Sequence, residues 1–129
     1  MSQALGALDV SFKAGADLSE KQYHLVKMSD SQTVNVPTAD ASTDVVIGVL
    51  QNKPESGEAA VVRVLGTSKV IVDASLTTVG SLVGVGTPAG YATIADANKD
   101  IVIGVLLETA SAAGDIVEIL LTGPSKASI

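Results

Sequence analysis

The clearest hydrophobic pattern is an aliphatic run that occurs twice. The run at 44–50, DVVIGVL, returns 56 positions later at 100–106 as DIVIGVL, with six of seven residues identical. Neither run alternates with polar residues, and a continuous aliphatic run is typical of a strand covered on both faces. The second cover is either the chain itself or a neighbouring subunit. Gly48 and Gly104 interrupt these strands, which predicts a bulge or the close approach of another backbone.

Each run continues through a turn into a second strand that does alternate. These strands lie between Gly57 and Gly66 and between Gly114 and Gly123. Arg63 and Glu118 fall on one face, which is therefore not expected to be the buried one. The opposite face is the predicted core face and carries Ala60, Val62 and Val64 in the first copy and Val117, Ile119 and Leu121 in the second. Two copies are too few for a solenoid, so we interpret them as a duplicated β-hairpin inside one barrel or sandwich.

Shorter strands separated by polar and glycine-rich turns are predicted at 21–28, 33–36, 69–73 and 91–94. A turn at 66–68 should precede the strand at 69–73. We find no convincing helix, since glycines weaken the amphipathic pattern near residues 5–12. The chain is therefore predicted to be all-β, a single small β-barrel or sandwich.

The ends of the chain carry weaker patterns than its middle. We expect an extended N-terminal arm at 1–20, the β-domain at 21–123 and a short tail at 124–129, because such termini are usually held loosely. On this interpretation, removing residues 1–15 should leave a folded domain.

Composition narrows the possible functions. The 129 residues suit one domain, and they are 47% hydrophobic with one Phe, two Tyr and no Trp. Such a core favours tight sheet packing over an aromatic-lined pocket. The absence of cysteine excludes disulfides and thiolate sites. The longest apolar stretch, 101–107, is far shorter than the roughly 20 residues of a membrane helix, and the N-terminus has no basic head typical of a secretory signal.

The net charge of −6 argues against nucleic acid as a partner. The eight basic residues are scattered along the chain, so no basic patch is predicted. Packaged DNA would repel an acidic protein, and on a DNA-filled particle this chain should lie outside.

No constellation for catalysis or metal binding emerges. His24 is the only histidine and is interpreted as an ordinary strand residue. The acidic pairs at 40 and 44, 55 and 58, and 96 and 100 lie in turn-like contexts, and 96–100 lacks the glycine and glutamate of an EF-hand loop. The segment 84–89, GVGTPA, matches a dinucleotide fingerprint, but a strand rather than a helix should follow it. We therefore predict no enzyme, no catalytic residue, no metal and no cofactor.

Several of these segments together resemble a family of capsid cement (decoration) proteins of tailed bacteriophages. The similarity rests on YHLVK at 23–27, DVVIGVLQNKP at 44–54, GEAAVVRVLG at 57–66, and IGVL at 103–106 with GDIV at 114–117. It implies a jelly-roll-like or β-tulip-like barrel without catalysis that binds the outside of the mature head as a homodimer or homotrimer. Its partners would be the major capsid protein and itself, with no membrane, nucleic acid or small-molecule substrate. The protein would be made in the host cytoplasm and located on the virion.

Such a protein would bridge capsomers and hold the shell against internal DNA pressure. The candidate contact elements are the N-terminal arm and the glycine-bearing strands, represented by Leu5, Leu8, Val10, Phe12, Val45, Ile47, Gly48, Val49, Ile101, Ile103, Gly104 and Val105. The first alternative is a carbohydrate- or ligand-binding β-module, although the chain has few aromatic residues to build a platform. A minor enzyme of unknown type is the second alternative.

Overall fold

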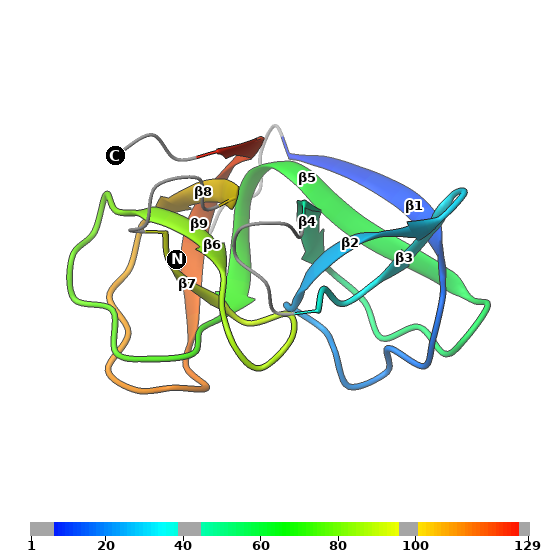
Figure 1. Ribbon diagram of the computed structural model, residues 1–129, viewed down its shortest axis with the longest axis horizontal. Coiled ribbons are helices and arrows are strands. Elements are labelled where there is room, and N and C mark those ends of the chain that lie inside the picture. The colour runs from blue at the N-terminus through cyan, green and yellow to red at the C-terminus, as the bar shows by residue number, and fades with distance from the viewer. Residues whose placement is uncertain (1–6, 39–44, 96–100, 127–129) are drawn as a thin grey trace.

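The computed structural model describes residues 7–38, 45–95 and 101–126, and in these ranges it contains nine strands and no helix (Figure 1). The all-β prediction is therefore confirmed for the described residues. The strands are β1 (Leu8–Ala14), β2 (Leu25–Asp30), β3 (Thr33–Asn35), β4 (Val46–Leu50), β5 (Ala59–Ile71), β6 (Leu82–Val85), β7 (Ala92–Ile94), β8 (Ile101–Leu106) and β9 (Ile116–Lys126).

Five strands close a small barrel in the order β1-β3-β2-β4-β5. The closure comes from β1, which pairs in parallel with β3 and antiparallel with β5. β5 is 13 residues long and extends beyond this barrel, where its second half pairs with β9 (Figure 1). A positive φ of 100° at Gly66 occurs where the strand passes from β1 to β9. The expected turn at 66–68 is therefore a bend inside one strand.

The remaining strands repeat this arrangement in the order β5-β9-β8-β6-β7. In the first set Ala14 pairs in parallel with Val34, and in the second set an isolated parallel bridge joins Val72 to Ala92. We call residues 8–65 the first unit and residues 66–126 the second unit. The predicted hairpins are confirmed as β4–β5 and β8–β9. They are the best-preserved part of a duplication that spans nearly the whole chain.

The register shows that the two units correspond residue by residue. Leu25 pairs with Val49 and Val49 with Arg63 in the first unit. In the second unit the same row is Leu82, Val105 and Leu120. This correspondence allows equivalent positions of the two units to be compared directly.

The mid-strand glycines behave as their positions predicted. The register of β2 against β4 shifts next to Gly48, and that of β8 against β9 shifts next to Gly104. A Cβ on Gly48 would collide with the backbone carbonyl of Arg63, and one on Gly104 with the carbonyl of Leu120. Both a bulge and a close backbone approach are therefore present. Gly84 in β6 has the same relation to the Ile101 carbonyl, which the sequence pattern did not reveal.

The predicted core face is mostly confirmed. Five of its six residues are buried and Val64 is half-buried. Glu118, on the opposite face, is also buried, with 8% of its surface exposed, although its neighbours on that face, Ile116 and Leu120, are exposed. The first core contains Ala14, Leu18, Val26, Val34, Leu50, Ala60 and Val62, and the larger second core is built mainly from β5–β9.

The expectation that both ends of the chain are loosely held is wrong for the parts of them that the structure describes. Residues 8–14 are not an unpaired arm, because they form β1 and close the barrel. Residues 124–126 are not a free tail, because β9 continues to Lys126 and pairs with β8. The pattern also missed β6, whose four residues contain a glycine. The division of the chain at 20 and 124 is otherwise untested.

Candidate functional site

The predicted contact residues divide by burial into three groups. Leu8 and Val45 are exposed, with 48% and 51% of their surfaces accessible. Val10, Phe12, Ile47 and Val105 are half-buried, whereas Gly48, Val49, Ile101, Ile103 and Gly104 are buried, and Leu5 lies outside the described residues. The buried residues are occupied in the chain's own packing, so contact with a partner stays a prediction only for residues with accessible surface.

The structure adds exposed apolar residues that the sequence analysis did not single out. Leu8 pairs in register with Leu65, and both side chains are about half exposed, at 48% and 46%. Leu82 and Leu120 are also exposed and flank Val105 across three adjacent strands. The signal for Leu120 was present in the alternation of β9, on the face that we set aside because of Glu118.

A bidentate ion pair fastens β1 to β5. The Arg63 guanidinium donates to both carboxylate oxygens of Asp9, with Nε 2.8 Å from Oδ1. Hydrogen bonding to Arg63 holds the pKa of Asp9 below its usual value, and the same contact raises the pKa of Arg63. Because both side chains are partly solvated, this pair fixes the register of the barrel seam more than it stabilises the fold.

His24 lies between the two units and is buried, with 6% of its surface exposed. Its ring packs edge-on against Tyr91 at a centroid distance of 5.2 Å, and Nδ1 lies 3.2 Å from the Gln22 carbonyl oxygen. Gly90 fits beside it, since a Cβ there would crowd the ring. Burial lowers the pKa of His24 below its ordinary value, the Gln22 carbonyl opposes that shift, and the charge of Lys21 adds to it.

We expect the free energy of unfolding to fall as the pH drops from about 7.5 to 5.5. The unfolded histidine gains its proton near pH 6.5, whereas the folded one resists protonation, so acid favours the unfolded state. Urea unfolding at both pH values should show a smaller loss of stability in His24→Gln than in the wild type. The carboxyl groups of Asp9, Asp17 and Asp115, whose pKa values are lowered, titrate below this window. An equal loss in both proteins would show that His24 is not responsible.

The other candidate chemistry has structural explanations. In the described ranges no three metal-ligating side chains gather in one place. Glu58 accepts a hydrogen bond from the Glu55 backbone N–H, as expected of a turn, and the acidic pairs at 40–44 and 96–100 lie outside those ranges. The segment 84–89 joins β6 to β7, and no helix follows it. No described helix is long and apolar enough to span a membrane.

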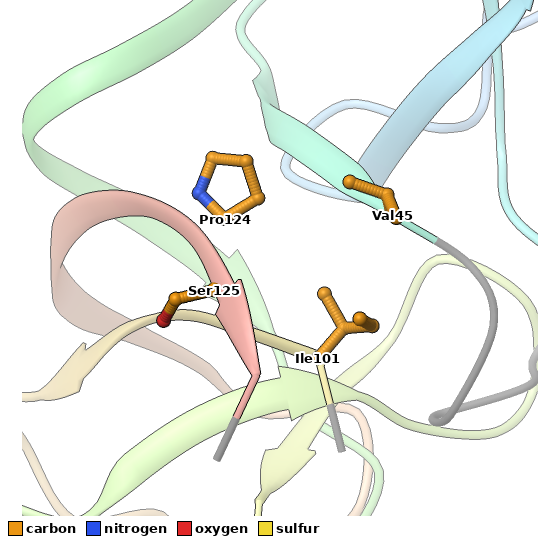
Figure 2. Close-up of a pocket in the computed structure, with 4 residues that line it drawn as sticks. All are labelled: Val45, Ile101, Pro124 and Ser125. Carbon is orange, nitrogen blue, oxygen red and sulfur yellow. The ribbon is translucent and has the colours of Figure 1, made fainter. Parts of the chain in front are cut away.

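Figure 2 shows a shallow apolar pocket between the units, lined by Val45, Ile101, Pro124 and Ser125. Its volume of about 210 Å³ is below the roughly 300 Å³ at which drug-sized ligand sites begin. The aromatic residues do not form a platform either. Tyr91 packs on His24, Lys69 lies over the ring of Tyr23, and Phe12 is half-buried in the first core. These observations weigh against the ligand-binding alternative.

The whole described arrangement has a counterpart among solved structures. The fold matches a phage head-fiber base. The crystal structure of the head fiber gp8.5 N base in bacteriophage phi29 is similar over 95% of this chain and 99% of that chain, with a TM-score of 0.66 and 20% sequence identity. No protein-family model and no curated protein sequence matches the chain. The similarity establishes the fold, and coverage of nearly the full length of both chains means that both units are included.

Proposed function

We propose that this chain is a non-enzymatic structural protein of a tailed-phage head. In this proposal it binds the outer surface of the shell as a homo-oligomer and bridges neighbouring capsid subunits, as a cement protein does. The observation that carries the proposal is the fold shared with the phi29 head-fiber base over almost the full length of both chains. The sequence resemblance to cement proteins supports the same role from independent observations.

Charge and chemistry are compatible with that location. A net charge of −6 disfavours contact with packaged DNA, which favours the outside of the shell over the inside. The buried histidine and the turn carboxylates have structural explanations. This favours a function carried out by the surface of the protein, through binding, over a catalytic one. A bridging protein also gains from linked contacts, because a second contact made by the same molecule is effectively intramolecular.

The exposed pair Leu8–Leu65 is the surface we assign to the capsid. Both are large apolar side chains on adjacent strands, and the Asp9–Arg63 ion pair beside them fixes the register of the two strands. Val45, immediately before β4 in the same unit, is also exposed. A preorganised apolar pair with a charged rim is the usual composition of a protein contact.

Adding the purified chain to heads that lack it should give saturable binding and raise the temperature at which the heads release DNA. Leu8→Asp should weaken binding by about ten- to hundredfold, because burying a leucine is worth about 1.5–3 kcal/mol. Cosedimentation with heads measures occupancy, and a fluorescent DNA dye reports release.

Val79→Asp is the matched control, since Val79 is 55% exposed in the second unit and lies outside the proposed contact. Melting curves of the free variants establish that both are folded. Mass analysis of virions of the phage that encodes the chain tests its location. Absence from the virion would overturn the proposal, whereas binding that is unchanged in Leu8→Asp would overturn only the assigned surface.

A further inference from the structure

Inside one chain, the two units contact each other through two different surfaces. We call the surface that the first unit contributes the donor side and the surface of the second unit that it covers the acceptor side. The donor side is the outer face of β2 and β4, where Leu25, Val46 and Val49 are fully buried. These residues do not join the first core. They pack in the second core instead, and β4 contacts both β8 and β9. The outer wall of one unit therefore covers the interior of the next.

The donor side of the second unit is only partly covered by the described residues. By register, Leu82, Val102 and Val105 are equivalent to Leu25, Val46 and Val49. Val102 is buried, with 3% of its surface exposed, and Val105 is half-buried. Leu82 is 41% exposed, whereas its equivalent Leu25 is completely buried. The next residue in the row is Leu120, 40% exposed, where the first unit has the ion-paired Arg63. The exposed part of this wall, at Leu82 and Leu120, is thus more apolar than its covered counterpart, which is unfavourable in water.

The acceptor side shows the opposite asymmetry. In the second unit the interior positions Val70, Val85, Ile103 and Leu121 are at most 3% exposed. Their equivalents in the first unit, by the pairing of each strand, are Phe12, Met28, Ile47 and Val64. Met28 is 40% exposed and the other three are half-buried. Among the described residues, the first core therefore lacks the cover that the first unit supplies to the second.

We propose that a second copy of this chain supplies both missing covers. The donor wall of one molecule, Leu82–Val105–Leu120, docks on the acceptor positions of the next, Phe12, Met28, Ile47 and Val64, and repeats between chains the contact already made within each chain. The two surfaces differ, so the association is head-to-tail. Such a contact closes into a ring if the rotation permits and otherwise extends into a filament.

This proposal specifies the self-association included in the proposed function, but its test needs no phage heads. The purified full chain should sediment as an oligomer. Leu120→Asp, on the donor wall, and Met28→Asp, on the acceptor side, should each weaken association at least about tenfold, the loss of about 1.4 kcal/mol. Val79→Asp is the exposed control and should remain oligomeric. Melting curves confirm that each variant is folded.

Mixing the two variants gives the decisive measurement. Each variant keeps one intact surface, and the two intact surfaces are complementary, so an equimolar mixture should form a 1:1 dimer and nothing larger. A contact between identical patches would not be restored by mixing. Three results would each overturn the proposal: a wild-type chain that stays monomeric, variants that assemble like the wild type, or a mixture that remains monomeric. None of these results bears on whether the chain binds phage heads.

Discussion

Gly48→Ala and Gly104→Ala should each lower the free energy of unfolding by about 1–3 kcal/mol or more, the cost of forcing extra atoms into a packed core. The new Cβ would meet a backbone carbonyl oxygen, of Arg63 in one case and Leu120 in the other. A backbone atom held in a sheet cannot rotate away as a side chain can, so the strands must separate. Urea unfolding followed by far-ultraviolet circular dichroism measures the loss.

Gly57→Asn is the matched control for this prediction. Gly57 has a φ of 84°, and a Cβ at this position would have no neighbouring atom within 4 Å. Asparagine also tolerates the left-handed region better than most residues. The free energy of unfolding of the Gly57→Asn variant should differ from that of the wild type by no more than about 0.5 kcal/mol, as for most surface substitutions. Wild-type stability in either alanine variant would mean that the strand crossing at that glycine is not as close as the structure shows.

Deleting residues 1–14 should abolish the cooperative unfolding transition or lower its midpoint severely. The deletion removes β1, which pairs with both β3 and β5 and closes the first barrel. It opens the core beside Ala60 and Val62 and removes the buried Ala14. The first unit in turn covers the second core through Leu25, Val46 and Val49, so the damage should spread. We expect a cost above about 5 kcal/mol, comparable to the whole stability of many domains.

A shorter deletion distinguishes the contribution of β1 to stability from that of the residues that precede it. Removing residues 1–6 leaves β1 whole and should preserve the cooperative transition measured by differential scanning calorimetry. A stable, cooperatively folded protein after loss of residues 1–14 would contradict the closed barrel. It would instead favour the loose arm expected from the composition of this segment.

The hairpins show how far local pattern is informative. Continuous aliphatic runs predicted strands buried on both faces, and all residues of β4 and β8 except the half-buried Ile47 and Val105 are buried. The glycine in each run predicted the bulge and the close approach, since only a residue without Cβ fits there. The core face of β5 and β9 followed from alternation and the placement of charge, with Glu118 as the exception.

β1 and β6 are the two strands that we did not expect from the sequence. The segment at 8–14, LDVSFKA, does alternate apolar and polar residues, and Val10, Phe12 and Ala14 are less exposed than the residues between them. The signal for a strand was therefore present in a segment that we interpreted as a loose arm. Its partner β5 lies 46 to 57 positions further along the chain and shares an ion pair and a ladder of paired residues with it. β6 has four residues, and its glycine serves a backbone crossing with β8. The sequence pattern does not show which strand either of them pairs with.

The amino-acid pattern alone predicts that the chain is built of strands, that two hairpins are related and that glycine is required where their backbones cross. Each of these properties is local, because it depends on side-chain size and alternation within a few residues. The packing of the folded chain extends the duplication to nine strands and makes the first unit the cover of the second. It also decided that Leu25 is buried while the equivalent Leu82 is exposed. Burial of equivalent residues differs because it depends on what packs against them, and in this chain each unit has a different neighbour.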